Sequence, residues 1–345
     1  MSLRSEIFEQ PDVLEGLLSR QMDRIQEIAA QIRRQDVEYA VLAARGTSDN
    51  AGRYANYVWG AYNRLPVALA TPSLYTFYQK TPRLRGALVV GISQSGHSPD
   101  IVSVVADGKR QGCPTLAITN DPASPLAQAA DFVLDIQAGP EIAVAATKTY
   151  TASLMGIAML SACLAADQER LAQLRQVPEW TRQALLRDAA VSRLSLRYTY
   201  MQRCVVLGRG FNYATTFEWA LKMKELAYVE AEPYSSADFL HGPIAMVERG
   251  FPVMAVAPDG GVYATLAEVL QKVHDEQLAN LTVISNRPEA LALAESPIPL
   301  PAGIPEWLSP IVAIIPGQLF AYHLTRHKGY DPEAPRSIHK VTETE

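Results

Sequence analysis

The sequence has few cysteines and no excess of basic residues, and we expect no apolar run as long as a membrane-spanning helix. Its three cysteines, Cys113, Cys163 and Cys204, lie far apart, and none has a histidine at metal-ligand spacing. We therefore expect reduced, mostly buried thiols, with neither a disulfide framework nor a zinc site. The formal net charge is −5 and no helix is striped with lysine and arginine, which argues against nucleic acid as the main partner.

The start of the chain also lacks the apolar region of a signal peptide. With no membrane-length run, we expect a cytoplasmic protein without a membrane partner. His323 and His327 lie at i and i+4, yet the residues between them include no catalytic glutamate. The last turn of a helix that ends at Gly329 explains these histidines better than a metal does, and we expect neither metal nor cofactor.

What the sequence does contain is enough apolar side chains for two cores, since 48% of its 345 residues are hydrophobic and 19% are charged. It also repeats itself. Residues 39–46 resemble residues 203–210, so that Gly46 precedes Gly210 by 164 positions. Residues 115–120 resemble residues 281–286, and Asn120 precedes Asn286 by 166 positions. Two matches at nearly one offset predict two copies of one structural plan.

Each copy alternates short apolar strands with amphipathic helices. The first copy predicts strands over 87–92 and 114–119 joined by a helix over 101–111, and the second predicts strands over 252–257 and 280–285 joined by a helix over 263–278. This spacing gives right-handed crossovers and a parallel sheet covered on both faces. The predicted fold class is therefore α/β, with two tandem flavodoxin-like doubly wound sheets that bind ligands outside the carboxyl ends of their strands.

The predicted domain boundaries follow from this plan. A helical stretch over about 149–187, bent at Gln176–Glu179, joins the two copies, and a helix after Glu9-Gln10-Pro11 precedes the first sheet. We expect an N-terminal helical segment over 1–30, a first domain over 31–165, a connector over 166–190, a second domain over 191–329 and an extended tail over 330–345.

A hydroxyl-rich loop, Gly91–Ser98, closes the apolar strand of the first copy. Serine hydroxyls and backbone N–H groups suit a phosphoryl group, and a helix with Pro99 in its first turn aims its positive end at the loop. An ordinary serine- and glycine-rich turn is an equally good explanation of the loop alone. The second copy has Ala257–Gly261 at this position, so only the first copy is predicted to bind an anion.

Three charged residues of the second copy, Glu218, Lys222 and Glu225, share one face of a helix predicted over 216–228. Such spacing is commonly a solvated face of salt bridges, but this helix follows the strand and Gly-Arg-Gly turn that should face a cleft, where a carboxylate beside an ammonium can move a proton. A lone histidine such as His241 is more often a capping or packing residue than a catalytic one. A lysine five residues from the end, such as Lys340, ordinarily belongs to a disordered tail.

Several motifs in order carry a more specific signal, namely residues 6–11, 45–48, 93–96, 141–148, 218–225 and 241–243, and residues 335–336 with Lys340. In this order they resemble the sugar isomerase (SIS) family, and specifically the isomerase part of glucosamine-6-phosphate synthase and its stand-alone deaminase relatives. The resemblance covers nearly the whole chain. It implies a small-molecule sugar phosphate as the partner.

The resemblance also implies a role for each matching residue. The sugar phosphate would be bound by Ser93, Gln94, Ser95 and Ser98, and the rest of the sugar site would be lined by Gly46, Thr47, Ser48, Val144, Ala146 and Thr147. Glu225 would move a proton between C1 and C2, with Lys222 and Glu218 on the same helix face. His241 would open the sugar ring from the neighbouring subunit, which implies a homodimer, and Lys340 would form an imine with the ketose carbonyl.

These implied roles agree with the chemistry of an aldose–ketose shift, which needs a base over two adjacent carbons, an acid for the ring oxygen and a way to acidify the C–H bond. For Lys340 to act as a nucleophile, we expect an apolar or cation-flanked pocket that lowers its pKa. The tail would then be ordered over the active site.

The sequence departs from the synthase in three places. It begins where the isomerase part begins and its first cysteine is Cys113, so we expect no glutaminase and no glutamine-dependent synthesis by this polypeptide alone. The segments His97–Asp100 and Lys340–Thr344 resemble the stand-alone deaminases more closely. The favoured reaction is therefore conversion of glucosamine 6-phosphate and water to fructose 6-phosphate and ammonia, or its reverse.

Three alternatives stay open. In the first, the enzyme acts on galactosamine 6-phosphate or on a fructosamine 6-phosphate. In the second, the chain is the isomerase part of an aminotransferase that lacks its glutaminase. The third is a non-catalytic sugar-phosphate sensor. The presence of Glu225, His241 and Lys340 together argues against a sensor, as does the lack of a DNA-binding segment before Tyr39.

Overall fold

The computed structural model describes residues 2–340, so the part of the predicted tail after Lys340 lies outside the described residues. The chain forms two compact units. The N-terminal unit contains residues 9–142, 146–176 and 339–340, and the C-terminal unit contains residues 2–8, 143–145 and 177–338. The domain boundaries expected from the sequence stay a prediction.

The N-terminal unit contains a parallel five-stranded sheet with the order β2-β1-β3-β4-β5. Its strands are β1 (Tyr39–Ala43), β2 (Val67–Leu69), β3 (Ala87–Ile92), β4 (Thr115–Thr119) and β5 (Phe132–Asp135). Its helices are α2 (Gly46–Asn63), α3 (Ser73–Thr76), α4 (Pro99–Arg110), α5 (Pro125–Ala129), α6 (Lys148–Ala165) and α7 (Gln168–Leu174). The helix α1 (Leu3–Ile32) precedes them.

The C-terminal unit repeats this plan, and its parallel sheet has the order β10-β9-β8-β6-β7. The strands are β6 (Arg203–Gly208), β7 (Glu230–Ser235), β8 (Pro252–Val256), β9 (Asn280–Ser285) and β10 (Ser296–Pro299). The helices are α8 (Val177–Leu185), α9 (Asp188–Leu196), α10 (Tyr213–Ala227), α11 (Ser236–Leu240), α12 (Tyr263–Asp275), α13 (Pro288–Ala292) and α14 (Ser309–His327), with 3₁₀ turns η1 (Gly210–Asn212), η2 (Pro243–Met246) and η3 (Glu306–Leu308).

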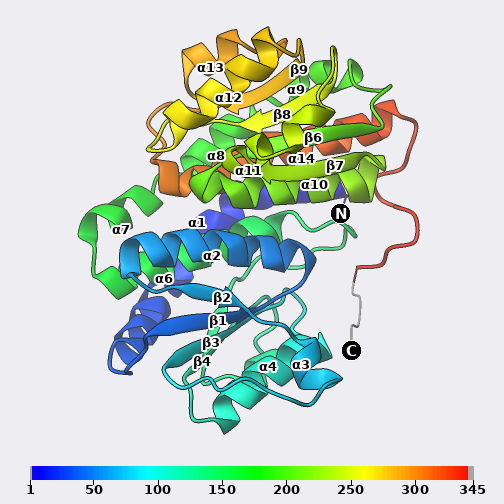
Figure 1. Ribbon diagram of the computed structural model, residues 1–345. Coiled ribbons are helices and arrows are strands. Elements are labelled where there is room, and N and C mark those ends of the chain that lie inside the picture. The colour runs from blue at the N-terminus through cyan, green and yellow to red at the C-terminus, as the bar shows by residue number, and fades with distance from the viewer. Residues whose placement is uncertain (1, 341–345) are drawn as a thin grey trace. The chain divides into compact units, whose positions relative to one another are not determined.

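Both sheets have helices on their two faces (Figure 1). In the N-terminal unit α2 and α6 cover one face and α4 the other, and every residue of β3 is buried. A strand that is covered on both faces has apolar residues at successive positions, so the sequence predicts such strands well. The prediction of two doubly wound α/β units is confirmed, and both anchor glycines, Gly46 and Gly210, adopt the left-handed backbone conformation directly after a first strand.

Two helical predictions differ from the structure. The first helix begins at Leu3 rather than after Pro11, and proline stands inside it. The proline removes one backbone hydrogen bond, but helical geometry on its N-terminal side buries Leu3 and Ile7 completely. The predicted stretch over 149–187 is divided into α6, α7 and α8, because Ala166 takes a left-handed conformation after α6. The bend expected over Gln176–Glu179 is only partly correct, because α7 and α8 are separated at Arg175 and Gln176, whereas Val177–Glu179 form the first turn of α8.

One segment of the described chain, Glu306–His327, is long and apolar enough to cross a membrane by length and composition. The sequence-based expectation that no apolar stretch reaches that length is therefore wrong. All of its apolar window is buried inside the protein. It includes α14, which packs on α9 and α10 as a core helix of the C-terminal unit.

Candidate active site

The loop between β3 and α4 is shaped by a glycine and by its own serines. Gly96 has a φ of 68°, and a Cβ at this position would lie 2.1 Å from the Ser124 hydroxyl oxygen. Ser93 Oγ accepts the Gly96 N–H at 3.1 Å, and Ser95 Oγ accepts the His97 N–H at 3.3 Å. Because both hydroxyl oxygens act as acceptors within the loop, their O–H protons are available for a bound anion.

Further donors stand at the start of α4. Ser98 is the N-cap residue of this helix, but its side chain makes no capping hydrogen bond. Within residues 2–340 the structure gives no acceptor for the backbone N–H of Ser95 or of Ser98. The Gln94 carbonyl accepts the N–H of Asn120 at 3.1 Å, which fixes the loop against the end of β4. The arrangement suits an anion bound by neutral donors and by the helix dipole.

The loop between β1 and α2 reaches the same edge of this sheet. Since β1 and β3 are neighbours whose crossovers lead in opposite directions, their carboxyl ends flank the topological switch point. Thr47 and Ser48 lie in the first turn of α2, directly after Gly46. The structure therefore brings these predicted residues and the Ser93–Ser98 loop to one sheet edge.

An ion pair between an exposed arginine and a buried aspartate, which the sequence did not predict, ties these two loops together. Arg45 Nε lies 2.8 Å from Asp100 Oδ2, and the Asp100 side chain is completely buried. Arg45 precedes the first turn of α2, and Asp100 lies in the first turn of α4. An aspartate directly after Ser98-Pro99 was the only local signal, and it does not reveal a partner 55 positions away.

A second buried carboxylate, Glu141, organises the start of α6. Its Oε1 accepts the N–H of Thr147 at 2.9 Å and that of Thr149 at 3.1 Å. Its Oε2 accepts the Thr149 hydroxyl at 2.8 Å and Lys340 Nζ at 2.6 Å. Burial raises the pKa of Glu141, but the Lys340 ammonium and the two backbone N–H groups outweigh it, so that the pKa is lowered.

The surroundings of Lys340 differ from those expected. An imine-forming lysine is predicted to lie in an apolar or cation-flanked pocket, whereas the structure places the Lys340 ammonium against the Glu141 carboxylate. The expectation was wrong because a carboxylate with no exposed surface needs a counter-charge, and Lys340 supplies it. The Lys340 side chain is 23% exposed, so a small molecule can still reach it.

Acid is expected to remove the stabilisation that Glu141 provides. Because its folded pKa lies below the ordinary 4.5, this stabilisation is fully present above pH 4.5 and is lost as the pH falls through the folded value. Urea midpoints of the wild type and Glu141→Gln should therefore differ by a constant amount from pH 7 to about pH 5 and converge as the pH falls below 4.5. A difference that persists unchanged in acid would contradict this interpretation.

The segment before α6 is shared between the two units. Val144 belongs to the C-terminal unit, where the neighbouring Ala143 N–H donates to Glu6 Oε1 at 3.2 Å. Ala146 and Thr147 belong to the N-terminal unit, and Thr147 is the N-cap residue of α6. Both Val144 and Ala146 are half-buried.

The three charges on α10 form a buried cluster rather than a solvated face. Lys222 Nζ lies 2.6 Å from Glu225 Oε2 and 3.3 Å from Glu218 Oε1. The side chains of Lys222 and Glu218 are 1% and 0% exposed, and that of Glu225 is 24% exposed. Burial lowers the pKa of Lys222, but the two carboxylates outweigh it and raise the pKa. Lys222 is therefore a permanent cation, and Glu225 is the member of the cluster that a substrate can reach.

His241 lies at the end of α11 with its side chain exposed. Its backbone N–H donates to the Asp238 carbonyl at 3.0 Å, and Gly242 follows with a φ of 141°. His241 is thus the C-cap residue of α11 through its backbone, whereas its imidazole is exposed and has no hydrogen-bond partner in the described part of the chain. It is available to a ligand or to another molecule.

In the second copy, the position of the anion loop is occupied by the protein itself. Glu306 Oε2 accepts the Gly261 N–H at 2.7 Å, and a Cβ on Gly260 would lie 2.2 Å from the Glu306 carboxyl carbon. A carboxylate thus fills the place after β8 that corresponds to the loop after β3. That only the first copy binds an anion stays a prediction, and a carboxylate at this place in the second copy would repel one.

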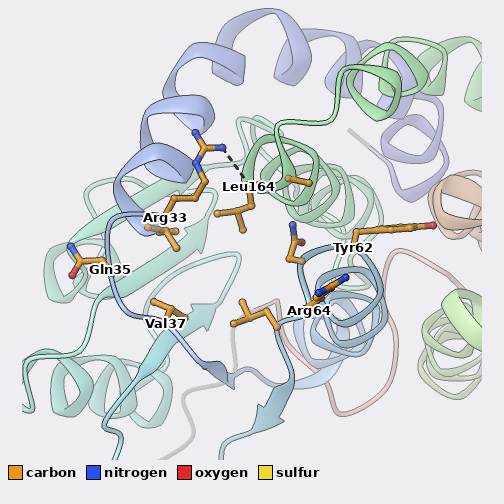
Figure 2. A pocket seen from close by; sticks show the side chains of 10 residues that line it. Arg33, Gln35, Val37, Tyr62, Arg64 and Leu164 are labelled. Carbon is orange, nitrogen blue, oxygen red and sulfur yellow. Dashed lines mark hydrogen bonds between the residues drawn. The ribbon is translucent and has the colours of Figure 1, made fainter.

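A cavity of about 340 Å³ lies elsewhere in the N-terminal unit, beside the residues that precede β1 and β2 (Figure 2). None of the predicted site residues lines it. Arg33, on its wall, donates to the carbonyls of Cys163 at 2.6 Å and Leu164 at 3.4 Å. Since these carbonyls lie at the end of α6, Arg33 caps the C-terminus of that helix. The residues that line the cavity do not include the loop between β3 and α4.

The fold and these sites define a tandem, doubly wound α/β protein with one hydroxyl-lined loop after β3 and a partly exposed carboxylate paired with a buried ammonium. The SIS domain matches residues 35–162 and 200–328, and the chain belongs to this family. The two matched segments correspond to the two copies recognised in the sequence.

Relatives and solved structures agree with this assignment. The glutamine–fructose-6-phosphate aminotransferase (isomerizing) of Aquifex aeolicus is 33% identical over 99% of this chain, which spans 57% of that relative's length. The C-terminal domain of glucosamine-fructose-6-phosphate aminotransferase from Francisella tularensis is 28% identical, with a TM-score of 0.85 over 95% of this chain and 96% of that one. Glucosamine-6-phosphate deaminase of Thermotoga maritima, 19% identical, shares the fold with a TM-score of 0.78 over the whole of both chains.

Proposed function

We propose that the protein is an amino-sugar phosphate isomerase and deaminase that interconverts glucosamine 6-phosphate plus water with fructose 6-phosphate plus ammonia. Membership of the SIS family and the names of the relatives support a sugar-phosphate isomerase. The observation that carries the proposal is the cluster on α10, where the partly exposed Glu225 is held by a buried, permanently charged Lys222. A sugar-phosphate sensor needs the anion loop but has no use for such a cluster.

Each residue has an assigned role in this proposal. The phosphoryl group is bound by the loop donors, and the remaining sugar contacts come from the second set of predicted residues, Gly46, Thr47, Ser48, Val144, Ala146 and Thr147. His241 assists ring opening in a neighbouring subunit of a homodimer. Lys340 forms an imine with the ketose carbonyl, which makes the adjacent C–H bond acidic, and Glu225 carries the proton between C1 and C2.

Deamination is the direction we favour, although one site lowers the barrier for both directions. This chain spans only 57% of the length of the aminotransferase from Aquifex aeolicus, and the proposal concerns only the part that the two proteins share. A cytoplasmic location remains a prediction.

The test is an assay of ammonia release from glucosamine 6-phosphate by a folded sample, with fructose 6-phosphate measured in parallel. Galactosamine 6-phosphate and a fructosamine 6-phosphate in the same assay decide the substrate among the alternatives. Binding of all three sugars without turnover of any would contradict the proposed enzyme and favour a sugar-phosphate sensor. Turnover of one alternative sugar alone would keep the mechanism and change the substrate.

Replacing Ser95 with alanine should weaken sugar-phosphate binding by about 10- to 100-fold, because a hydrogen bond to a charged group contributes about 1.5–3 kcal/mol. Titration calorimetry with glucosamine 6-phosphate measures the change. Ser103→Ala is the matched control, since the Ser103 hydroxyl donates to the Asp100 carbonyl at 2.7 Å within α4. Equal affinity of Ser95→Ala and the wild type would show that the loop does not bind the phosphate.

A further inference from the structure

The last described residue of the chain is attached to the N-terminal unit by one polar contact, from Lys340 Nζ to Glu141 Oε2. Both residues belong to this unit, although they are 199 positions apart in the sequence. The Glu141 side chain has no exposed surface, and that of Lys340 is 23% exposed. The carboxylate is thus a fixed, interior group, and the ammonium is the part that solvent reaches.

The remaining contacts of Glu141 hold the carboxylate still. Two backbone N–H groups and one hydroxyl from the start of α6 bind it, at Thr147 and Thr149. A carboxylate held by three donors from a helix N-terminus has one preferred position and orientation. Over residues 2–340, Lys340 is the cation that pairs with it. The geometry of the carboxylate therefore fixes the place of the amine.

We propose that Glu141 is the positioning residue for Lys340, holding its amine for imine formation and neutralising the positive charge of the protonated imine. This inference rests on the proposed function and names a group that the function does not yet include. Glu141 acts through Lys340 and needs no contact with the sugar.

The step balances in atoms and charge. Lys340 reacts as the free amine after its ammonium gives up a proton, and the nitrogen adds to the ketose carbonyl to form a carbinolamine. Uptake of one proton expels the hydroxyl as water and leaves a protonated imine, so that an ammonium and a ketone yield a protonated imine and water. The positive charge on nitrogen is present at the start and at the end, and in both states the Glu141 carboxylate neutralises it.

The other explanation of these contacts is that Glu141 only caps α6. A cap stabilises the helix and has no effect on the reactivity of a lysine in the tail. The two explanations therefore differ in what happens at the Lys340 amine when the charge of Glu141 is removed.

The first experiment measures this reactivity without substrate. An amine-acylating reagent is applied for short times to the full chain, and modification of Lys340 is followed by mass spectrometry. In Glu141→Gln, loss of the carboxylate that favours the charged form leaves more free amine, and we expect labelling about tenfold faster. Glu9→Gln is the matched control, because Glu9 binds Lys148 at 2.6 Å in the same unit; it should leave Lys340 unchanged.

The second experiment uses fructose 6-phosphate and borohydride to trap the imine across a range of pH. The inference expects Glu141→Gln to trap more slowly at neutral pH and to reach its maximum at lower pH than the wild type. If the wild type traps sugar on Lys340 and Glu141→Gln shows the same rate and pH profile, the inference is overturned. Absence of trapping in the wild type would instead overturn the proposed function, while the labelling result still decides the contact.

If Glu141→Gln does not fold, Glu141→Asp provides the test. Its side chain keeps the negative charge but is one methylene shorter, which moves the carboxylate away from Lys340. Labelling of Lys340 between the rates of the wild type and free lysine supports the inference. Labelling at the wild-type rate contradicts it.

Discussion

Replacing Glu225 with glutamine is expected to lower the rate of sugar-phosphate interconversion by about 10²- to 10⁴-fold, the usual contribution of a positioned general base. Glutamine has the shape of glutamate and can still accept a hydrogen bond from Lys222, so the fold should be kept. It cannot take up a proton from carbon. The affinity for the sugar phosphate should stay within about twofold, because the phosphate is bound by the serine loop in this proposal.

The measurement is exchange of the C2 proton of glucosamine 6-phosphate with deuterated solvent, followed by NMR, together with calorimetric binding. Glu230→Gln is the matched control, since Glu230 is an exposed glutamate at the start of β7 in the same unit. Full exchange in Glu225→Gln would remove this residue from the mechanism. Loss of exchange in both variants would point to a general effect of charge.

The strands and the helices that cover them were predictable, because each is indicated by a short, contiguous stretch of sequence. The strands at the centre of each sheet, β3 and β8, are completely buried, mostly apolar runs, and a helix follows each of them along the chain. The repeat gave a second, independent indication of the same order of strands. The anion loop could be placed for the same reason, since β3, Ser93–Ser98 and Pro99 are contiguous.

What the sequence does not reveal is which charges are buried and which distant partners they find. The i, i+4 spacing of Glu218 and Lys222 is the same on a solvated helix and in a core, and burial depends on how α10 packs against α14 and β7. Likewise, Arg45–Asp100 and Glu141–Lys340 join residues 55 and 199 positions apart. Such pairs are products of the tertiary fold, and for Lys340 the missing partner led to the wrong expectation about its surroundings.

Burial makes the α10 cluster the place where one substitution should cost most stability. Lys222→Met puts an uncharged side chain of similar length in place of the lysine, and so removes the ammonium that pairs with Glu225 and with the completely buried Glu218. Removing one partner of a buried pair costs about 3–5 kcal/mol, whereas an exposed lysine costs less than about 0.5 kcal/mol. Lys224→Met, on the exposed side of the same helix, is the control.

The unfolding experiment can be done at neutral pH, because the raised pKa of Lys222 means that its contribution is fully present below the ordinary value of 10.5 and is lost only as the pH rises through the higher folded value. Urea unfolding should show a large fall in midpoint for Lys222→Met and almost none for Lys224→Met. Adding Glu218→Gln to Lys222→Met should restore part of the loss, because the amide takes one negative charge out of the buried cluster from which the ammonium was removed. A double variant less stable than Lys222→Met would mean that Glu218 is stabilised by contacts other than the ammonium.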